Sequence, residues 1–69
     1  MESEILLHVE GMTGKKCEDA ITREICQMIP GVELVQVNTD QGTVSITGGD
    51  LDLLYAQDIV ESLGYMVTH

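Results

Sequence analysis

The sequence predicts an α+β fold in which four antiparallel strands form a sheet and two helices cover one of its faces. Three observations support this fold. Apolar residues alternate with other residues in four short segments, they recur at helical spacing in two longer segments, and glycine, proline and asparagine separate the segments. The chain has 69 residues, which leaves room for one domain, 1–69, because typical domains run to about 100–150 residues.

The first strand is predicted where Ile5, Leu7 and Val9 alternate with more polar neighbours, because this is the pattern of a strand with one buried face. The pattern ends at Gly11. We expect Thr13 to cap the helix that follows, since a threonine hydroxyl can accept a backbone N–H of the first turn.

The first helix is predicted over about residues 14–28, where one apolar stripe recurs at helical spacing and Pro30-Gly31 ends the helix. The stripe consists of Cys17, Ile21, Ile25 and Met28. A hairpin is predicted next. Val35 and Val37 alternate with their neighbours in its first strand, Val44 and Ile46 do so in its second, and residues 38–42 have the composition of a turn.

The second helix is predicted to begin at Asp50, a good N-cap residue, and to end at Gly64, which suits the left-handed conformation that follows many helices. Its apolar stripe consists of Leu53, Ala56, Val60 and Leu63. A short last strand is expected from Tyr65 to Thr68.

The order of these elements, strand-helix-strand-strand-helix-strand, is that of the ferredoxin-like βαββαβ sandwich. The face of the sheet away from the helices is then mostly polar, with Leu6, His8, Gln36 and Ser45. Two functions found on this topology are excluded. RNA recognition needs aromatic residues on the central strands, which carry none. An acylphosphatase-type enzyme needs an arginine in the first loop, but Arg23 lies within the first helix and no other arginine is present.

The net charge is −9, with only three lysine and arginine residues in total. So few cations argue against nucleic-acid binding and against binding to an anionic membrane. No apolar segment approaches the roughly 20 residues that span a bilayer, and the N-terminal residues are acidic where a signal peptide would be basic. We therefore expect a cytoplasmic protein.

The two cysteines, Cys17 and Cys26, are too few for a disulfide scaffold and are expected to be free thiols. They cannot pair with each other within one helix. Nine residues of helix correspond to a rise of about 13.5 Å, whereas a disulfide needs Cα atoms within about 7 Å.

The junction between the first strand and the first helix has the sequence Gly11-Met12-Thr13-Gly14-Lys15-Lys16-Cys17. It resembles the G-M-T-C-x-x-C motif of the heavy-metal-associated (HMA) domain family, which includes copper chaperones and N-terminal domains of copper-transporting ATPases. Further matches run along the chain: Val9-Glu10-Gly11, Ile21, Pro30-Gly31-Val32, Val35-x-Val37-Asn38, Gly42-Thr43-Val44-x-Ile46 and Leu63-Gly64-Tyr65. The resemblance implies a copper-chaperone-like protein that binds Cu(I) or another soft metal ion and is not an enzyme.

The chain departs from the family pattern in two ways. Gly14 stands where the motif has its first cysteine, so Cys17 is the only candidate metal ligand of the motif. The first helix also has one more residue than the family pattern between Ile21 and Pro30, which leaves open whether Ile25 or Cys26 faces the core.

Cys17 has the surroundings of a reactive thiol. It lies in the first turn of a helix and directly follows Lys15 and Lys16, so we expect its pKa to be lowered. Alternatives stay open for both features. Cys17 could instead be an inert packing residue left over from a lost site. The two lysines could instead be ordinary solvated residues, or a docking spot for an acidic partner.

The other candidate residues have supporting or structural roles. Met12 is expected to anchor the loop on the core, and Tyr65 either shields Cys17 or closes the second helix. Cys26 is expected in the core or at its boundary. His8 lacks a second ligand at helical or hairpin spacing and His69 is terminal, so both are expected to be structural or solvent-facing. The remaining acidic candidates are interpreted as a solvated face: Glu18, Asp19, Glu24 and Glu61.

Two hypotheses for function follow. In the first, the chain binds Cu(I) through a degenerate one-cysteine site. The second ligand of the ion is then a small thiol, or Cys17 of a second copy in a homodimer formed through the Met12–Cys17 loop. In the second, no metal is bound, and the domain is a regulatory or interaction module for a metal-transport ATPase or another protein.

Overall fold

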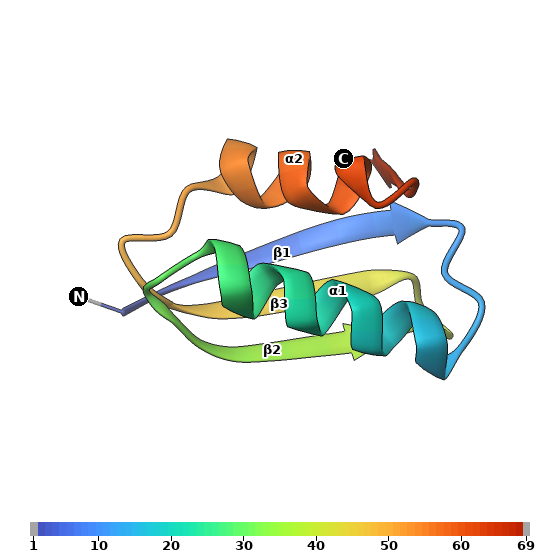
Figure 1. Ribbon diagram of the computed structural model, residues 1–69, viewed down its shortest axis with the longest axis horizontal. Coiled ribbons are helices and arrows are strands. Elements are labelled where there is room, and N and C mark those ends of the chain that lie inside the picture. The colour runs from blue at the N-terminus through green and yellow to red at the C-terminus, as the bar shows by residue number, and fades with distance from the viewer. Residues whose placement is uncertain (1, 69) are drawn as a thin grey trace.

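The computed structural model describes residues 2–68, with side chains from Ser3 onward. The chain forms six elements in the predicted order (Figure 1). They are β1 (Glu2–Glu10), α1 (Lys15–Met28), β2 (Val32–Asn38), β3 (Thr43–Gly49), α2 (Leu53–Ser62) and β4 (Met66–Thr68).

The strands form one antiparallel sheet in the order β2-β3-β1-β4, and both helices lie on the same face of it (Figure 1). This confirms the ferredoxin-like fold. The register pairs Ile5 with Ile46 and Leu7 with Val44, so the alternating apolar residues of neighbouring strands meet on the helix side. β4 pairs with β1 only over three residues, from His8 to Glu10.

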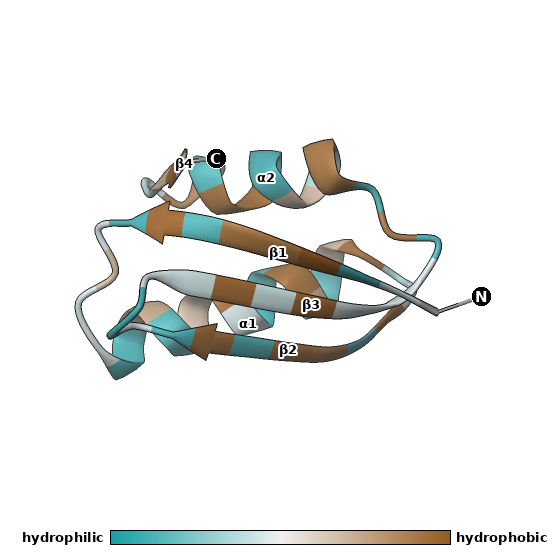
Figure 2. Cartoon of the chain, turned by 180° about the vertical axis from the view of Figure 1, so that it is seen from behind, coloured by the Kyte–Doolittle hydropathy of each residue, from teal (hydrophilic) through white to brown (hydrophobic). Residues whose placement is uncertain are grey.

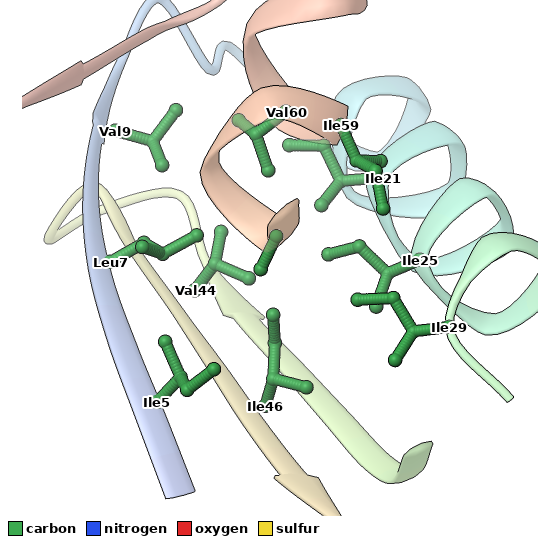
Figure 3. Close-up of a cluster of buried hydrophobic side chains, with 11 residues drawn as sticks. Ile5, Leu7, Val9, Ile21, Ile25, Ile29, Val44, Ile46, Ile59 and Val60 are labelled. Atoms are coloured by element: carbon green, nitrogen blue, oxygen red, sulfur yellow. The ribbon is translucent and has the colours of Figure 1, made fainter. Parts of the chain in front are cut away.

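The hydrophobic core lies between the sheet and the two helices (Figure 3). The apolar residues predicted for the inner face of β1 and β3 are all buried in it. Its members are Ile5, Leu7, Val9, Ile21, Ile25, Ile29, Val44, Ile46, Ala56, Ile59 and Val60. The opposite face of the sheet carries Leu6, His8, Gln36 and Ser45, none of them buried, as predicted.

The ends of α1 differ from the prediction. Gly14, not Thr13, is the N-cap residue, and no side chain caps the helix. At the other end Met28 is exposed and Ile29, one residue beyond the helix, is buried in its place. Within the helix, Ile25 is buried and Cys26 is exposed, so Ile25 faces the core and the expectation of a core or boundary Cys26 is wrong.

α2 begins two residues later than predicted. Asp52, not Asp50, is the N-cap residue, and its Oδ1 accepts hydrogen bonds from the backbone N–H groups of Leu54 and Tyr55. Leu53, expected in the apolar stripe, is consequently exposed, and Ile59 is buried beside Ala56 and Val60. The helix ends as predicted, because Gly64 has a φ of 100° and donates its N–H to the Glu61 carbonyl at 2.9 Å.

The chain passes very close to itself at the end of the sheet away from the first loop. The Gly49 N–H donates to the Gly31 carbonyl at 3.0 Å, and a Cβ atom on either Gly31 or Gly48 would overlap a backbone oxygen of the facing segment. Glycine is therefore required at both positions. Among the described residues, no helix has the length and apolar character needed to cross a membrane.

Candidate metal site

The candidate site is the loop that joins β1 to α1, at one end of the molecule (Figure 1). The loop leaves the sheet at Gly11, whose φ is 97°, and enters the helix at Gly14. Met12 between them is half-buried and packs against the core cluster, as expected of an anchor under the loop. β4 also begins next to this loop, because its first residue, Met66, pairs with Glu10 at the end of β1.

Cys17 is the third residue of α1 and is half-buried. Its Sγ lies 3.7 Å from the Thr13 Oγ1, within hydrogen-bond range for sulfur. Tyr65, which follows α2, is half-buried against the core, and its ring lies beside Gly11. Residues that are far apart in the sequence therefore meet at the loop, and the role of Tyr65, to shield Cys17 or to close the second helix, stays a prediction.

The surroundings of Cys17 stabilise its thiolate. The pKa of Cys17 is lowered, first by a hydrogen bond from the Tyr65 side chain and then by hydrogen bonds from the backbone and side chain of Thr13 and the backbone of Gly14, while slight desolvation opposes them. The same hydrogen bond raises the pKa of Tyr65, so the phenol stays protonated and remains a donor.

The lowered pKa was predicted, but its cause only in part: backbone groups at the start of the helix contribute to it, and the lysines do not. Lys15 and Lys16 are exposed, and their charges are not among the causes of the shift. The hydrogen bonds from Thr13 and Tyr65 hold the thiolate instead. The role of Thr13 was missed because its hydroxyl was expected at the helix N-terminus, while it points to Cys17 four residues on.

Gly14 occupies the position of the missing cysteine in open space. A Cβ atom built on Gly14 would have no heavy atom within 4 Å. The Cβ of a larger residue at this position would therefore meet no steric obstacle, and Gly14 lies three residues before Cys17 at the start of the same helix.

The other candidate ligands lie elsewhere. Cys26 is exposed farther along α1, and His8 is exposed on the open face of the sheet, where it pairs with Thr43 and Thr68. His69 lies outside the described residues. Within residues 2–68, no three His, Cys, Asp or Glu side chains are grouped so as to hold a metal ion. A single protomer thus presents one thiolate at the loop.

Comparison with known proteins identifies the family of this chain. The family model of the heavy-metal-associated domain matches residues 6–65, which is nearly the whole chain. This chain belongs to the heavy-metal-associated domain family. Members of this family are metal-binding and metal-transfer modules rather than enzymes, so this HMA domain is not an enzyme. No curated protein matches the sequence significantly.

Solved structures of HMA domains superpose closely on this one. The CopZ metallochaperone is 32% identical with a TM-score of 0.88, and the match covers 96% of this chain and 100% of that one. The N-terminal domain of PacS from Synechocystis PCC6803 is 30% identical with a TM-score of 0.81, over 96% and 94% of the two chains. A copper-binding domain of a P-type ATPase shares the fold, with a TM-score of 0.84 at 18% identity over 99% and 92%.

Proposed function

We propose that this HMA domain binds a soft metal ion, with Cu(I) as the first candidate, in a metallochaperone-like role in the cytoplasm. Cys17 is the proposed ligand, and the second sulfur comes from Cys17 of another copy. The observation that carries the proposal is that Cys17, a half-buried cysteine whose pKa is lowered by hydrogen bonds, lies in this loop, while the other cysteine, Cys26, is exposed farther along α1.

The donor set suits a shared ion. Cu(I) accepts two thiolate ligands, whereas the hydroxyl groups of Thr13 and Tyr65 are hard oxygen donors that it binds poorly. One protomer therefore offers one cysteine thiol at the loop, because the other soft side chain there, Met12, packs against the core. Two protomers related by a two-fold axis through the loop would offer two thiolates on opposite sides of the axis.

The electrostatics of such a dimer also favour it. A complex of one Cu(I) with two thiolates carries a net charge of −1. Lys15 and Lys16 of both copies would lie near this charge, because both residues are exposed in the turn that leads to Cys17. Their charge would compensate the bound complex, which explains why two of the chain's three cations lie at this loop.

Native mass spectrometry with stoichiometric Cu(I) tests the proposal. We expect one ion per two chains, lost in Cys17→Ala and retained in Cys26→Ala, which removes the other thiol. The Cys26→Ala variant is a matched control because Cys26 is exposed and distant from the loop. A monomer without bound copper at micromolar concentration would contradict the proposal.

One observation favours a metal-independent alternative. Lys15 and Lys16 are exposed and contribute nothing to the lowered pKa of Cys17, so they are free to dock an acidic surface of a metal-transport ATPase or another protein. In that case Cys17→Ala would leave partner binding intact, while Lys15→Glu with Lys16→Glu would weaken it and reduce its salt dependence.

A further inference from the structure

The end of the molecule away from the loop carries an exposed apolar surface. α1 ends there and α2 begins there, and the Tyr55 hydroxyl donates a hydrogen bond to the Met28 carbonyl at 3.3 Å, which joins the two helices (Figure 1). Leu54 is 74% exposed, Met28 46%, Leu53 44% and Tyr55 41%. We call these four residues the helix-end patch; Figure 2 shows the first turn of α2 as hydrophobic.

The core does not account for the helix-end patch. α2 buries Ala56, Ile59 and Val60, which lie beyond its first turn, and the late start of the helix at Asp52 leaves Leu53 and Leu54 facing solvent. Single exposed apolar residues are common, but several from two adjoining helices at one end of a small domain indicate an interaction surface.

Carboxylates flank the helix-end patch. Asp58 lies four residues after Leu54 and Glu24 four residues before Met28, so each carboxylate is one helical turn from a patch residue on the same face. The nearest cation along α1 is Arg23, beside Glu24, whereas Lys15 and Lys16 lie at the opposite end of the helix. α2 contains Asp58 and Glu61 and no lysine or arginine.

We propose that the helix-end patch docks a cationic amphipathic helix of a partner protein. The apolar stripe of such a helix would cover Leu54, Tyr55 and Met28, and its lysine and arginine residues would reach Asp58 and Glu24. A second copy of this chain suits the surface poorly, because its own patch is flanked by the same carboxylates, Asp58 and Glu24.

This site is independent of the metal loop. Cys17 lies in the first turn of α1 and Met28 at its last residue, about 16 Å along the helix axis at 1.5 Å per residue. The proposed contacts include neither Cys17 nor a bound metal ion, so Cys17→Ala is expected to leave docking at the patch unchanged.

The apolar part of the proposal is tested with a labelled synthetic helix of leucine and lysine, about 18 residues long so that it forms five turns. Fluorescence anisotropy measures its binding to the full chain. We expect Leu54→Ser to weaken binding at least ~10-fold, as at the centre of an interface. Leu6→Ser is the matched control, because Leu6 is 57% exposed on the open face of the sheet, and we expect it to leave the affinity unchanged.

The electrostatic part is tested with Asp58→Asn, which should weaken binding and flatten its dependence on salt, against Asp40→Asn in the β2–β3 turn as a control of equal charge. The proposal is overturned if a scrambled, non-amphipathic peptide of the same composition binds equally well, or if Leu54→Ser and Leu6→Ser behave alike. It is also overturned if sedimentation shows self-association that Leu54→Ser abolishes, because the patch would then belong to a second copy.

Discussion

The pKa of Cys17 depends on the hydroxyl group of Tyr65, a residue 48 positions later in the sequence. The hydrogen bond from Tyr65 is the largest cause of its lowered pKa. Because a lowered pKa increases the thiolate fraction at neutral pH, Tyr65 should preserve both the reactivity of Cys17 and its capacity to bind metal as the pH falls.

The first prediction concerns Tyr65→Phe, which removes the hydroxyl and keeps the ring. The pKa of Cys17 should rise, so the pH midpoint of its alkylation by iodoacetamide should move upward, measured in a Cys26→Ser background in which only one thiol reacts. Tyr55→Phe is the control, because the Tyr55 hydroxyl bonds to the Met28 carbonyl at the other end of α1. An unchanged midpoint in Tyr65→Phe would show that Thr13 and Gly14 suffice.

The second prediction concerns Gly14→Cys. Because a Cβ at Gly14 meets no heavy atom within 4 Å, the new side chain should fit without moving the loop. It should restore tight Cu(I) binding with one ion per chain, as measured by competition with a calibrated chelator. Gly14→Ser, which fits the same space with a hard oxygen donor, should not. Equal affinity of the two variants would contradict the prediction.

Part of the candidate metal site could be predicted from the sequence. The motif identifies Cys17 as the candidate ligand and Met12 as an anchor, because both depend on local spacing. The hydrogen bond from Thr13 was not predicted, and that from Tyr65 was suggested only by the family resemblance, because it depends on how the segment before β4 approaches the first turn of α1 in three dimensions. The charges of Lys15 and Lys16 suggested a different cause for the same lowered pKa.

Helix boundaries show where sequence patterns and tertiary structure compete. Asp50 and Asp52 are equally good N-cap residues, and the chain uses Asp52 because Asp50 takes up a left-handed conformation, with φ of 55°, in the turn after β3. This turn follows the close approach of Gly31 and Gly48, which no local pattern reveals. The strands were predicted well because period-2 alternation depends only on one buried face.

The third prediction tests the cap of α2. Asp52→Ala removes the acceptor for the Leu54 and Tyr55 N–H groups and should lower the free energy of unfolding by about 1 kcal/mol, measured by urea titration. Asp52→Asn loses the same charge but keeps an acceptor oxygen, so it should stay close to the original stability. If both variants lost equal stability, the effect would be electrostatic and the cap would be unimportant.

The first helix shows how a register is decided. An extra residue before Pro30 allows either Ile25 or Cys26 to face the core, and the structure buries Ile25 with Ile21 and Ile29 at a spacing of four residues. The buried stripe therefore extends past the last helical residue to Ile29. Cys26 and Met28 remain on the surface because the more apolar isoleucines fill the space above the sheet.

The whole molecule carries its charge unevenly. Its longest dimension is 32 Å, and its carboxylates are spread over most of this length while the cations belong to residues 15–23. Such a distribution destabilises the compact state through self-repulsion, to an extent that depends on screening.

The fourth prediction follows from this repulsion. Raising the NaCl concentration from about 10 mM to about 150 mM shortens the Debye length from about 30 Å to about 8 Å, and the thermal midpoint should rise. Circular dichroism measures it. A variant with Asp40→Asn and Asp58→Asn, which removes two exposed carboxylates, should gain less from the same salt. A midpoint that falls with salt would show that attractive charge pairs dominate.

The open space beside Gly14 has a genetic consequence. Glycine and cysteine codons of the forms GGT or GGC and TGT or TGC differ by a single base. Because a Cβ atom at this position meets no heavy atom within 4 Å, one point mutation would, on the proposed function, convert a site that shares its ion between two copies into one that binds it within a single chain, and one reversion would undo it. The one-cysteine and two-cysteine forms of the loop are thus separated by a single base change on the same fold.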